Sequence, residues 1–165
     1  MAVPRAKKKP KAKDPNLPDE WSRRRIMEGN WIVIATALFH GWNYYKYRRV
    51  RLERILNLYE EHLTKYWQRP GRYRQVLAVF DSKPYTTIDV QHRCDELGEY
   101  KKEVYKLTLG CMILALHELK WSKKRIDGVV LSVFHTLHQG NDLHWFLDNV
   151  RDTIGIDVRT EVVWS

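Results

Sequence analysis

The stretch RLERILNLYEEHL, residues 51–63, carries apolar side chains at a helical spacing. Its residues at positions i, i+3, i+4, i+7 and i+11 are Leu52, Ile55, Leu56, Tyr59 and Leu63. Residues with this spacing share one face of a helix, whereas a half-buried strand alternates apolar and polar residues. The stretch therefore predicts an amphipathic helix that packs one face against a core.

The same pattern recurs 74 residues later in RIDGVVLSVFHTL, residues 125–137. The corresponding pairs are Arg51 and Arg125, Leu52 and Ile126, Glu53 and Asp127, Ile55 and Val129, Leu56 and Val130, Tyr59 and Val133, and Leu63 and Leu137. An apolar helix precedes each stretch, followed by His, Trp and cations: ALFHGW with KYRR, and ALHELKW with SKKR. Any two amphipathic helices align to some extent, but the shared context predicts a duplication of residues 31–66 and 107–139.

The predicted fold class is all-α, a helical bundle in a single domain, residues 19–165, with two helical hairpins packed face to face. The run WIVIATALF, residues 31–39, is apolar on all sides and predicts a central buried helix. We expect a weak point at Gly29-Asn30 and a break near Gly41 and Asn43. A second long helix should then extend to about Gln68, before Pro70.

The second half predicts further helices and one strand. A helix is expected over residues 87–119, interrupted at Gly98, and Ser122 and Asp142 are expected N-caps of the next two helices. The expected helix ends are Gly140-Asn141 and Gly155. The tail IDVRTEVVW, residues 156–164, alternates and predicts a short strand.

The formal net charge of +9 is unevenly distributed. Residues 1–83 hold 19 Lys/Arg and 8 Asp/Glu, a net +11, whereas residues 84–165 hold 10 and 12, a net −2. This asymmetry predicts that the N-terminal half contacts an anionic partner, although high charge also serves solubility alone. Residues 1–18, MAVPRAKKKPKAKDPNLP, predict a disordered basic arm that either follows a nucleic-acid backbone or only solubilises the chain.

The stretch YYKYRRVRLERI, residues 44–55, interleaves cations with tyrosine rings. On a continuous helix, Lys46, Arg49 and Arg54 would point away from the buried stripe, and Glu53 would pair with Arg51 or Asn57. One carboxylate cannot neutralise this set, and interleaved cations and rings suit phosphate contact with base stacking. Tyrosines on a helix are, however, most often partly buried packing residues.

Similar cations occur elsewhere in the chain, and together they form the candidate nucleic-acid-binding set. Its members are Arg23, Arg24, Arg25, Lys46, Tyr47, Arg48, Arg49, Arg51, Arg54, Arg69, Arg72, Tyr73, Arg74, Lys123, Lys124 and Arg125. A sharper alternative is a helix-turn-helix formed by residues 107–119, a joint at 120–122 and a helix from Lys123. Against it, the rest of that second helix is apolar and offers few base-reading side chains.

Catalytic and metal-binding patterns are weak. His135, His138 and His144 lack the tight ligand pairs of a zinc site, and His92 lies near Cys94 without forming one. Clustered carboxylates near residues 95–103 alternate with lysines, as on a salt-bridged solvent face. The sequence has no G-x-S-x-G, P-loop or G-x-G-x-x-G motif. We therefore expect no enzyme activity, no catalytic residue, no metal and no cofactor.

Other patterns predict a soluble intracellular protein. Cys94 and Cys111 are widely spaced, which argues against a disulfide framework. The longest apolar runs, residues 31–39 and 111–116, are far shorter than the roughly 20 residues that span a bilayer. The N-terminal charges have no apolar segment directly behind them, so a secretory signal is not expected. The expected location is the cytoplasm, or the nucleus if the protein is eukaryotic.

Residues 107–158 resemble uncharacterised small helical proteins of Gram-positive phages and prophages. The resemblance rests on Ala115-Leu116-His117, Trp121, Lys123-Lys124-Arg125-Ile126 and Ile154-Gly155-Ile156. It implies a viral accessory protein in a bacterial host cell and implies no established chemistry. The joint Trp121-Ser122 departs from the pattern, in which glycines are expected.

The sequence favours a non-enzymatic nucleic-acid-binding accessory or regulatory protein that contacts phosphates through a basic-aromatic helix. The alternative is a protein-binding adaptor or inhibitor that acts on an acidic surface, including that of a nucleic-acid-handling protein. Aromatic side chains would then anchor the interface. No membrane partner is expected, and homo-oligomerisation is left open.

Overall fold

The computed structural model describes residues 20–68, 76, 85–140 and 142–161. Its helices are α1 (Glu20–Tyr45), α2 (Arg49–Gln68), α4 (Val90–Asp95), α5 (Glu99–Glu118), α6 (Lys123–Gln139), α7 (Leu143–Ile154) and α8 (Val158–Glu161). None of these described residues forms a strand, so the all-α prediction is confirmed. The predicted basic arm, residues 1–18, lies outside the described residues. No helix in the described ranges combines the length and apolar content needed to cross a lipid bilayer.

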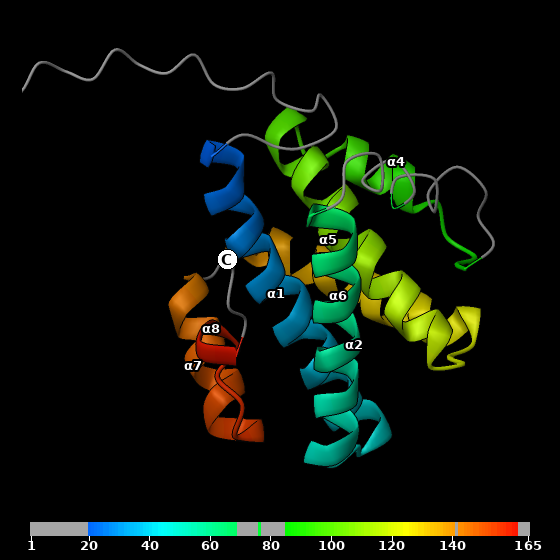
Figure 1. Ribbon diagram of the computed structural model, residues 1–165, viewed down its shortest axis with the longest axis vertical. Helices are drawn as coiled ribbons and strands as arrows, with labels where there is room; N and C mark the ends of the chain where they lie inside the picture. The colour runs from blue at the N-terminus through cyan, green and yellow to red at the C-terminus, as the bar shows by residue number, and fades with distance from the viewer. Residues whose placement is uncertain (1–19, 69–75, 77–84, 141, 162–165) are drawn as a thin grey trace, which may run out of the picture.

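Helix α1 lies in the middle of the molecule, as its apolar central turns predict (Figure 1). The fully buried side chains of those turns are Val33, Ile34, Ala35, Ala37 and Leu38. Helices α5 and α6 pack against α1 most extensively, and α7, α2 and α8 also contact it. A helix without a polar face gains most free energy where neighbours cover it on every side. The prediction of a central buried helix in residues 31–39 is confirmed.

Helices α2 and α6 direct their apolar stripes toward the core. The buried members are Leu52, Ile55, Leu56, Tyr59 and Leu63 of α2 and Ile126, Val129, Val130 and Val133 of α6. Leu137, at the end of the second stripe, is half-buried. All nine buried side chains belong to one apolar cluster shared with α1 and α5. The two amphipathic helices therefore pack as their spacing predicts.

The expected weak point at Gly29-Asn30 is wrong, because α1 continues through both residues. A Cβ atom on Gly29 would lie 2.5 Å from Cγ1 of Val104 in α5, so glycine permits the two helices to approach closely. Asn30 is fully buried and accepts a hydrogen bond from the Tyr59 hydroxyl of α2. Gly29 and Asn30 would weaken an isolated helix, but in the folded protein they allow α1 to contact α5 and α2.

The break predicted near Gly41 and Asn43 occurs later, at residues 46–48. Gly41 stays helical and lies against α2, since a Cβ atom there would be 3.2 Å from Cδ2 of Leu52. The second helix consequently begins at Arg49, and Lys46 lies in the connection rather than on a helix. The predicted continuous helix through YYKYRRVRLERI is therefore wrong at residues 46–48, which separate the last turn of α1 from the first turn of α2.

Several local signals act as predicted in the second half. Gly98 separates α4 from α5, and the Ser122 hydroxyl accepts a hydrogen bond from the Arg125 backbone N–H at 3.3 Å. Asp142 accepts from the Trp145 backbone N–H at 3.0 Å. Both side chains satisfy amides that the first helical turn leaves without a partner. Gly140 and Gly155 end α6 and α7 in the left-handed conformation.

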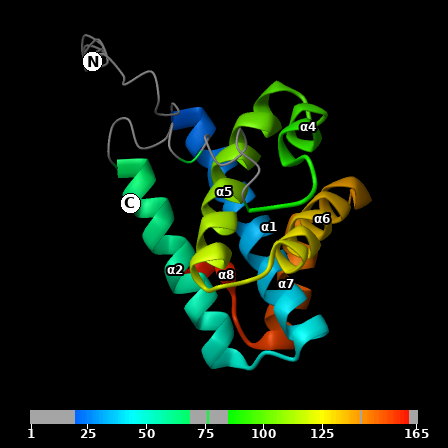
Figure 2. The same cartoon turned by 90° about the vertical axis from the view of Figure 1, so that its right-hand side faces the viewer.

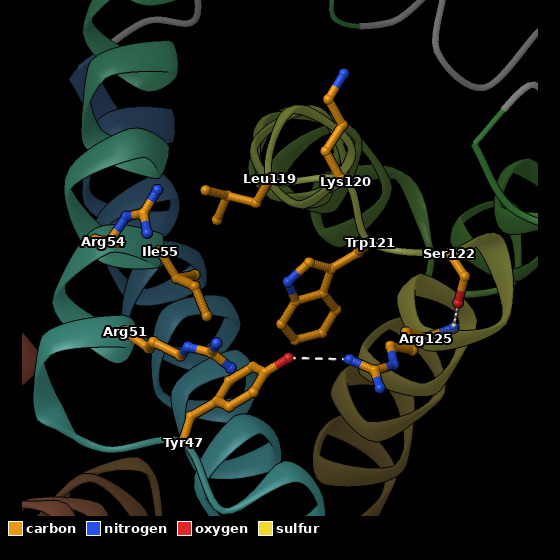
Figure 3. A pocket seen from close by; sticks show the side chains of 9 residues that line it. All are labelled: Tyr47, Arg51, Arg54, Ile55, Leu119, Lys120, Trp121, Ser122 and Arg125. Carbon is orange, nitrogen blue, oxygen red and sulfur yellow. Dashed lines mark hydrogen bonds between the residues drawn. The ribbon is translucent and has the colours of Figure 1, made fainter.

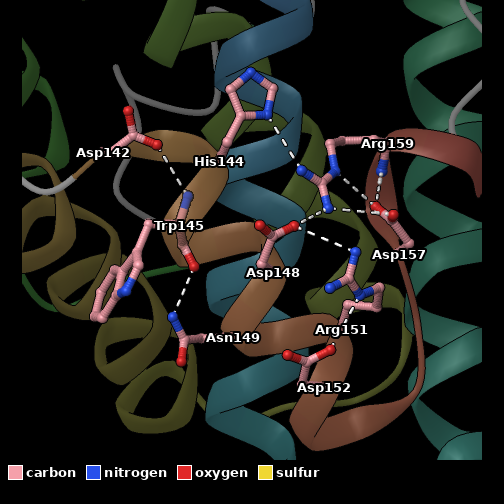
Figure 4. A network of polar contacts seen from close by, with 9 residues as sticks. All are labelled: Asp142, His144, Trp145, Asp148, Asn149, Arg151, Asp152, Asp157 and Arg159. Atoms are coloured by element: carbon pink, nitrogen blue, oxygen red, sulfur yellow. Dashed lines mark hydrogen bonds and ion pairs between the residues drawn. The ribbon is translucent and has the colours of Figure 1, made fainter.

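The predicted C-terminal strand is wrong, because residues 158–161 form the short helix α8 and residues 156–157 connect it to α7 without strand structure (Figure 4). Ile156 and Val158 are buried, so they anchor the segment to the core rather than to a neighbouring strand. Arg159 donates to Asp148 of α7 and to Asp157, with 2.9 Å between its Nε and Oδ1 of Asp157. The hydrogen bonds from Arg159 lower the pKa of both carboxyl groups. Residues 162–164 of the predicted strand lie outside the described residues.

The proposed duplication has structural correlates. Helices α2 and α6 begin at Arg49 and Lys123, which are 74 positions apart, the offset of the sequence match. The helices pack crosswise, since α1 contacts α6 more than α2, and α5 contacts α2 more than α6 (Figure 2). The hairpins therefore interlock rather than meet as separate pairs. These features favour the duplication, which stays a prediction.

Replacing Gly29 with Ala should destabilise the protein by about 1–3 kcal/mol, because the added methyl group meets Val104 at a close helix contact. The same replacement at an exposed helical glycine would stabilise the protein, since Ala is the better helix former by about 1 kcal/mol. Urea unfolding followed by circular dichroism measures the difference.

The control is the pair Gly29→Ala and Val104→Ala, alone and combined. Removing the γ-methyl groups of Val104 creates room, so the double variant should be more stable than the summed single effects predict. A stabilising Gly29→Ala, or strictly additive effects, would contradict the close contact between α1 and α5.

Candidate functional site

Two helix joints lie side by side and define the site. The first joint, residues 46–48, connects α1 to α2, and the second, residues 119–122, connects α5 to α6. Lys46 and Lys120 are the non-glycine residues with positive φ in the described chain, at 54° and 67°. They are also 74 positions apart, so the same unusual backbone conformation occurs at matching places in the two halves.

Backbone hydrogen bonds end α1 and α5 and fix the position of the residue that follows each left-handed lysine. At the second joint, the Lys120 N–H donates to the His117 carbonyl at 2.9 Å and the Trp121 N–H to the Leu116 carbonyl at 3.0 Å. This pair of bonds is the Schellman motif of a helix C-terminus. At the first joint, the Tyr47 N–H donates to the Gly41 carbonyl at 3.1 Å, one residue further back than the equivalent bond. Tyr47 and Trp121 therefore hold corresponding positions just after a left-handed lysine.

Aromatic contacts join the two connections. The ring of Trp121 lies 5.9 Å from that of Tyr47 and 5.5 Å from that of Tyr45, both in T-shaped geometry. Tyr45 and Tyr47 are themselves 5.6 Å apart. Edge-to-face pairs at such distances are favourable beyond the area they bury. The three rings thus fix the relative position of the joints.

Two arginines at matching positions lie against these rings. The guanidinium of Arg51 is 4.9 Å from the Tyr47 ring centre, and that of Arg125 is 4.4 Å from the Tyr45 ring centre. Arg125 also donates to the Tyr47 hydroxyl at 3.0 Å. Cation–π attraction stabilises a positive charge here without neutralising it. The rings therefore hold both guanidinium groups in place without an opposing charge.

The joints border a half-open cavity of about 420 Å³, which we call the basic cleft (Figure 3). It is lined by Tyr47, Arg51, Arg54, Ile55, Leu119, Lys120, Trp121, Ser122 and Arg125. Four of these residues are cations, and none of the described lining residues is acidic. Figure 3 shows Arg51 and Arg54 on one side of Trp121 and Arg125 on the other.

The charge of the basic cleft is not neutralised within the described structure. Glu53 pairs with Arg49 at 2.7 Å, not with Arg51 or Asn57 as predicted, because Arg49 is one helical turn before it. The four cations of the cleft form no ion pair with any described carboxylate. Each joint also brings the negative C-terminal end of one helix, α1 or α5, next to the positive N-terminal end of the following helix, so the helix dipoles add little and the side-chain cations set the charge of the cleft. The arrangement favours an anionic ligand.

The structure gathers part of the predicted binding set. Tyr47, Arg51, Arg54 and Arg125 line the cleft. Five other members are exposed near the same joints without lining it: Lys46, Arg48, Arg49, Lys123 and Lys124. Arg23, Arg24 and Arg25 belong to the first turns of α1, but their side chains lie outside the described part of the structure. Arg69, Arg72, Tyr73 and Arg74 lie outside the described residues altogether.

The predicted set lacks five lining residues: Ile55, Leu119, Lys120, Trp121 and Ser122. Among them, Lys120 and Trp121 add a cation and a ring to the cleft, and the sequence pattern marks both only as parts of a joint. The duplication contained the signal, since an offset of 74 pairs Lys46 with Lys120 and Tyr47 with Trp121. In the helix-turn-helix alternative, Lys123, Lys124 and Arg125 would be the base-reading residues, and Arg125 instead contacts Tyr45 and Tyr47 beside the cleft.

Other parts of the described chain offer little for catalysis. No group of three or more His, Cys, Asp or Glu residues in the described ranges is arranged to hold a metal ion. Cys94 and Cys111 are buried free thiols. Burial raises the pKa of Cys94 to about 12 and that of Cys111 further, so neither forms a thiolate readily.

A second cavity of about 410 Å³ lies between α1, α6 and α7. Its lining is largely apolar and includes Phe39, Tyr44, Leu131 and Phe146. Nδ1 of His40 lies 3.1 Å from the Ser132 hydroxyl in this cavity, and burial lowers the pKa of the imidazole. No described carboxylate contacts this imidazole, so the pair lacks the orienting group of a catalytic triad.

Comparison with protein-family models, curated proteins and solved structures gave no match.

Replacing Lys120 with Gly should stabilise the protein by up to about 1 kcal/mol. A left-handed conformation costs a residue with a Cβ atom about 1–2 kcal/mol, and the larger unfolded-state entropy of glycine offsets about 0.5–1 kcal/mol of that gain. Thermal unfolding measures the change. Lys120→Ala is the matched control, because it removes the same charge but keeps the Cβ atom. Equal stability of the Gly and Ala variants would contradict backbone strain at this joint.

Proposed function

We propose that this chain is a non-enzymatic nucleic-acid-binding protein that grips phosphates through the two joints. The observation that carries the proposal is the basic cleft, which Arg51, Arg54, Lys120 and Arg125 line without a described carboxylate. Two rings that lie among these cations, Tyr47 and Trp121, offer apolar surface for bases. Nucleic acids present both phosphates and planar bases, and the surrounding exposed cations favour a chain of phosphates.

The outer cations extend this surface. Lys46 and Arg48 flank the cleft on the first joint, and Lys123 and Lys124 flank it on the second, all exposed to solvent. A strand whose phosphate reaches the cleft would bring its neighbouring phosphates within range of these side chains. Such contacts position a nucleic acid without specifying its sequence, so the proposed binding has little sequence preference. The resemblance to phage proteins favours an accessory role in the host cytoplasm.

The test replaces Arg51, Arg54 and Lys120 together with Gln. Loss of three phosphate contacts should weaken binding and reduce the slope of log K against log salt by about 2–3, at about 0.7–0.9 per contact. Arg125 is kept because its contacts with Tyr45 and Tyr47 hold the joints together. Titration of labelled DNA and RNA at several salt concentrations gives the slopes.

A matched variant controls for net charge. Lys65, Arg93 and Lys101 are exposed cations on α2, α4 and α5 that do not line the cleft. Changing these three to Gln lowers the net charge equally and should reduce the slope much less. Circular dichroism must show both variants folded, because arginine stems also cover apolar surface. Absence of binding by the parent protein at low salt, or equal slopes for both variants, rejects the proposal.

The second candidate function is a protein-binding adaptor for an acidic partner. Tyr44 and Val50 favour it, because their side chains are 67% and 72% exposed beside the cations of the first joint. Exposed apolar residues bordered by charge are typical of protein interfaces. Affinity capture with and without nuclease separates the two functions. Partners that persist after nuclease treatment support the adaptor, and partners that disappear support nucleic-acid binding.

A further inference from the structure

The basic cleft has the dimensions of a small-ligand site rather than those of a duplex-binding surface. Its volume of about 420 Å³ falls within the range of about 300–1,000 Å³ typical of pockets that enclose small molecules. A double helix presents phosphates on its outside and keeps its bases stacked and paired. A duplex could therefore touch the rim of the cleft, but it could not fill the interior without unpairing.

The lining of the cleft is divided chemically in a way that fits one nucleotide. Arg51, Arg54, Lys120 and Arg125 provide the charge, whereas Ile55, Leu119 and Trp121 provide apolar surface. Figure 3 shows the Trp121 ring between Arg51 and Arg54 on one side and Arg125 on the other, with the end of the indole directed toward Tyr47. A phosphate and a base that are joined through one sugar need this combination of nearby cations and a ring.

The aromatic contacts prepare Trp121 for stacking. Tyr45 and Tyr47 hold the indole in T-shaped contacts, so little side-chain freedom remains to be lost when a base packs against it. The two joints place cations on both sides of this ring, which allows phosphates on either side of one base to be bound. Because a paired base cannot reach the ring, the ligand must carry an unpaired nucleotide.

Resting on the proposed function, we infer that the basic cleft binds one unpaired nucleotide of single-stranded nucleic acid, with its base against Trp121 and its phosphates on Arg51, Arg54 and Lys120. The protein is then selective for single strands over duplexes. This selectivity comes from the shape of the cleft and the indole, whereas the outer cations add affinity for either form.

The experiment compares labelled single-stranded DNA and RNA with duplexes of the same sequence, each about 20 nucleotides long so that they exceed one binding site. Fluorescence anisotropy with the full chain should show at least about ten-fold tighter binding of the single strands, because extruding a base from a duplex is unfavourable. Trp121→Leu keeps apolar volume but removes the stacking ring. It should weaken single-strand binding about 5- to 150-fold and leave duplex binding nearly unchanged.

Two variants make the result specific. Trp121→Phe keeps a smaller ring and should retain more single-strand affinity than Trp121→Leu, which also covers the case in which the Leu variant folds poorly. Trp145→Leu is the matched control, since Trp145 is exposed on α7 and does not line the cleft. It should bind both forms as the parent protein does. Thermal unfolding of each variant establishes that the fold is retained.

The outcomes separate this inference from the proposed function. Equal affinity for single strands and duplexes, unchanged by Trp121→Leu, would overturn the inference but leave phosphate binding intact. Binding of neither form at low salt would reject the proposed function itself. Adenosine monophosphate tests whether the cleft binds a free nucleotide, which also carries a phosphate and a base. If it displaces a labelled strand at micromolar concentration, the site serves free nucleotides and the assignment to single-stranded nucleic acid is wrong.

Discussion

Burial of α1 is the constraint on which the other helices depend. Its central turns have no polar face, so they must be covered from every side, and α5, α6, α7 and α2 provide that cover. Gly29 allows α5 to approach at Val104, and the buried Asn30 accepts the Tyr59 hydroxyl of α2. The same short segment of α1 therefore fixes two neighbours, one by close packing and one by a directional bond.

This packing also creates the candidate site. Because α1 packs on α6 and α5 packs on α2, the connections of the two hairpins meet side by side. Each connection has an aromatic residue after a left-handed lysine, and Tyr47 meets Trp121 where the two connections touch. The cations that follow on α2 and α6 are thereby concentrated around one cleft. Charges that are distant in the sequence become a single positive site through the arrangement of the core.

The basic cleft lowers the stability of the folded protein in two ways. Like charges converge in the cleft without a described carboxylate, and Lys120 adopts a conformation that glycine adopts without strain. Strain and unneutralised charge concentrated at one place are typical of functional sites. The tyrosine rings reduce these costs by holding Arg51 and Arg125 through cation–π contacts. An anionic ligand would reduce them further, which is the physical basis of the proposed function.

Local sequence patterns were enough to predict the long helices, the buried stripes of α2 and α6, the caps at Ser122 and Asp142, and the central place of α1. These features depend on local spacing and on short-range hydrogen bonds, which are visible in the order of residues. Tertiary structure alone decided that Gly29 and Gly41 remain inside α1, since their reason is contact with Val104 and Leu52 in other helices. It also decided that residues 158–161 form a helix, because Ile156 and Val158 insert into the core and Arg159 turns back to α7. For the site, the sequence supplied the cations and the tyrosines. Trp121 and Lys120 joined them only through crosswise packing of the hairpins, which no local pattern encodes.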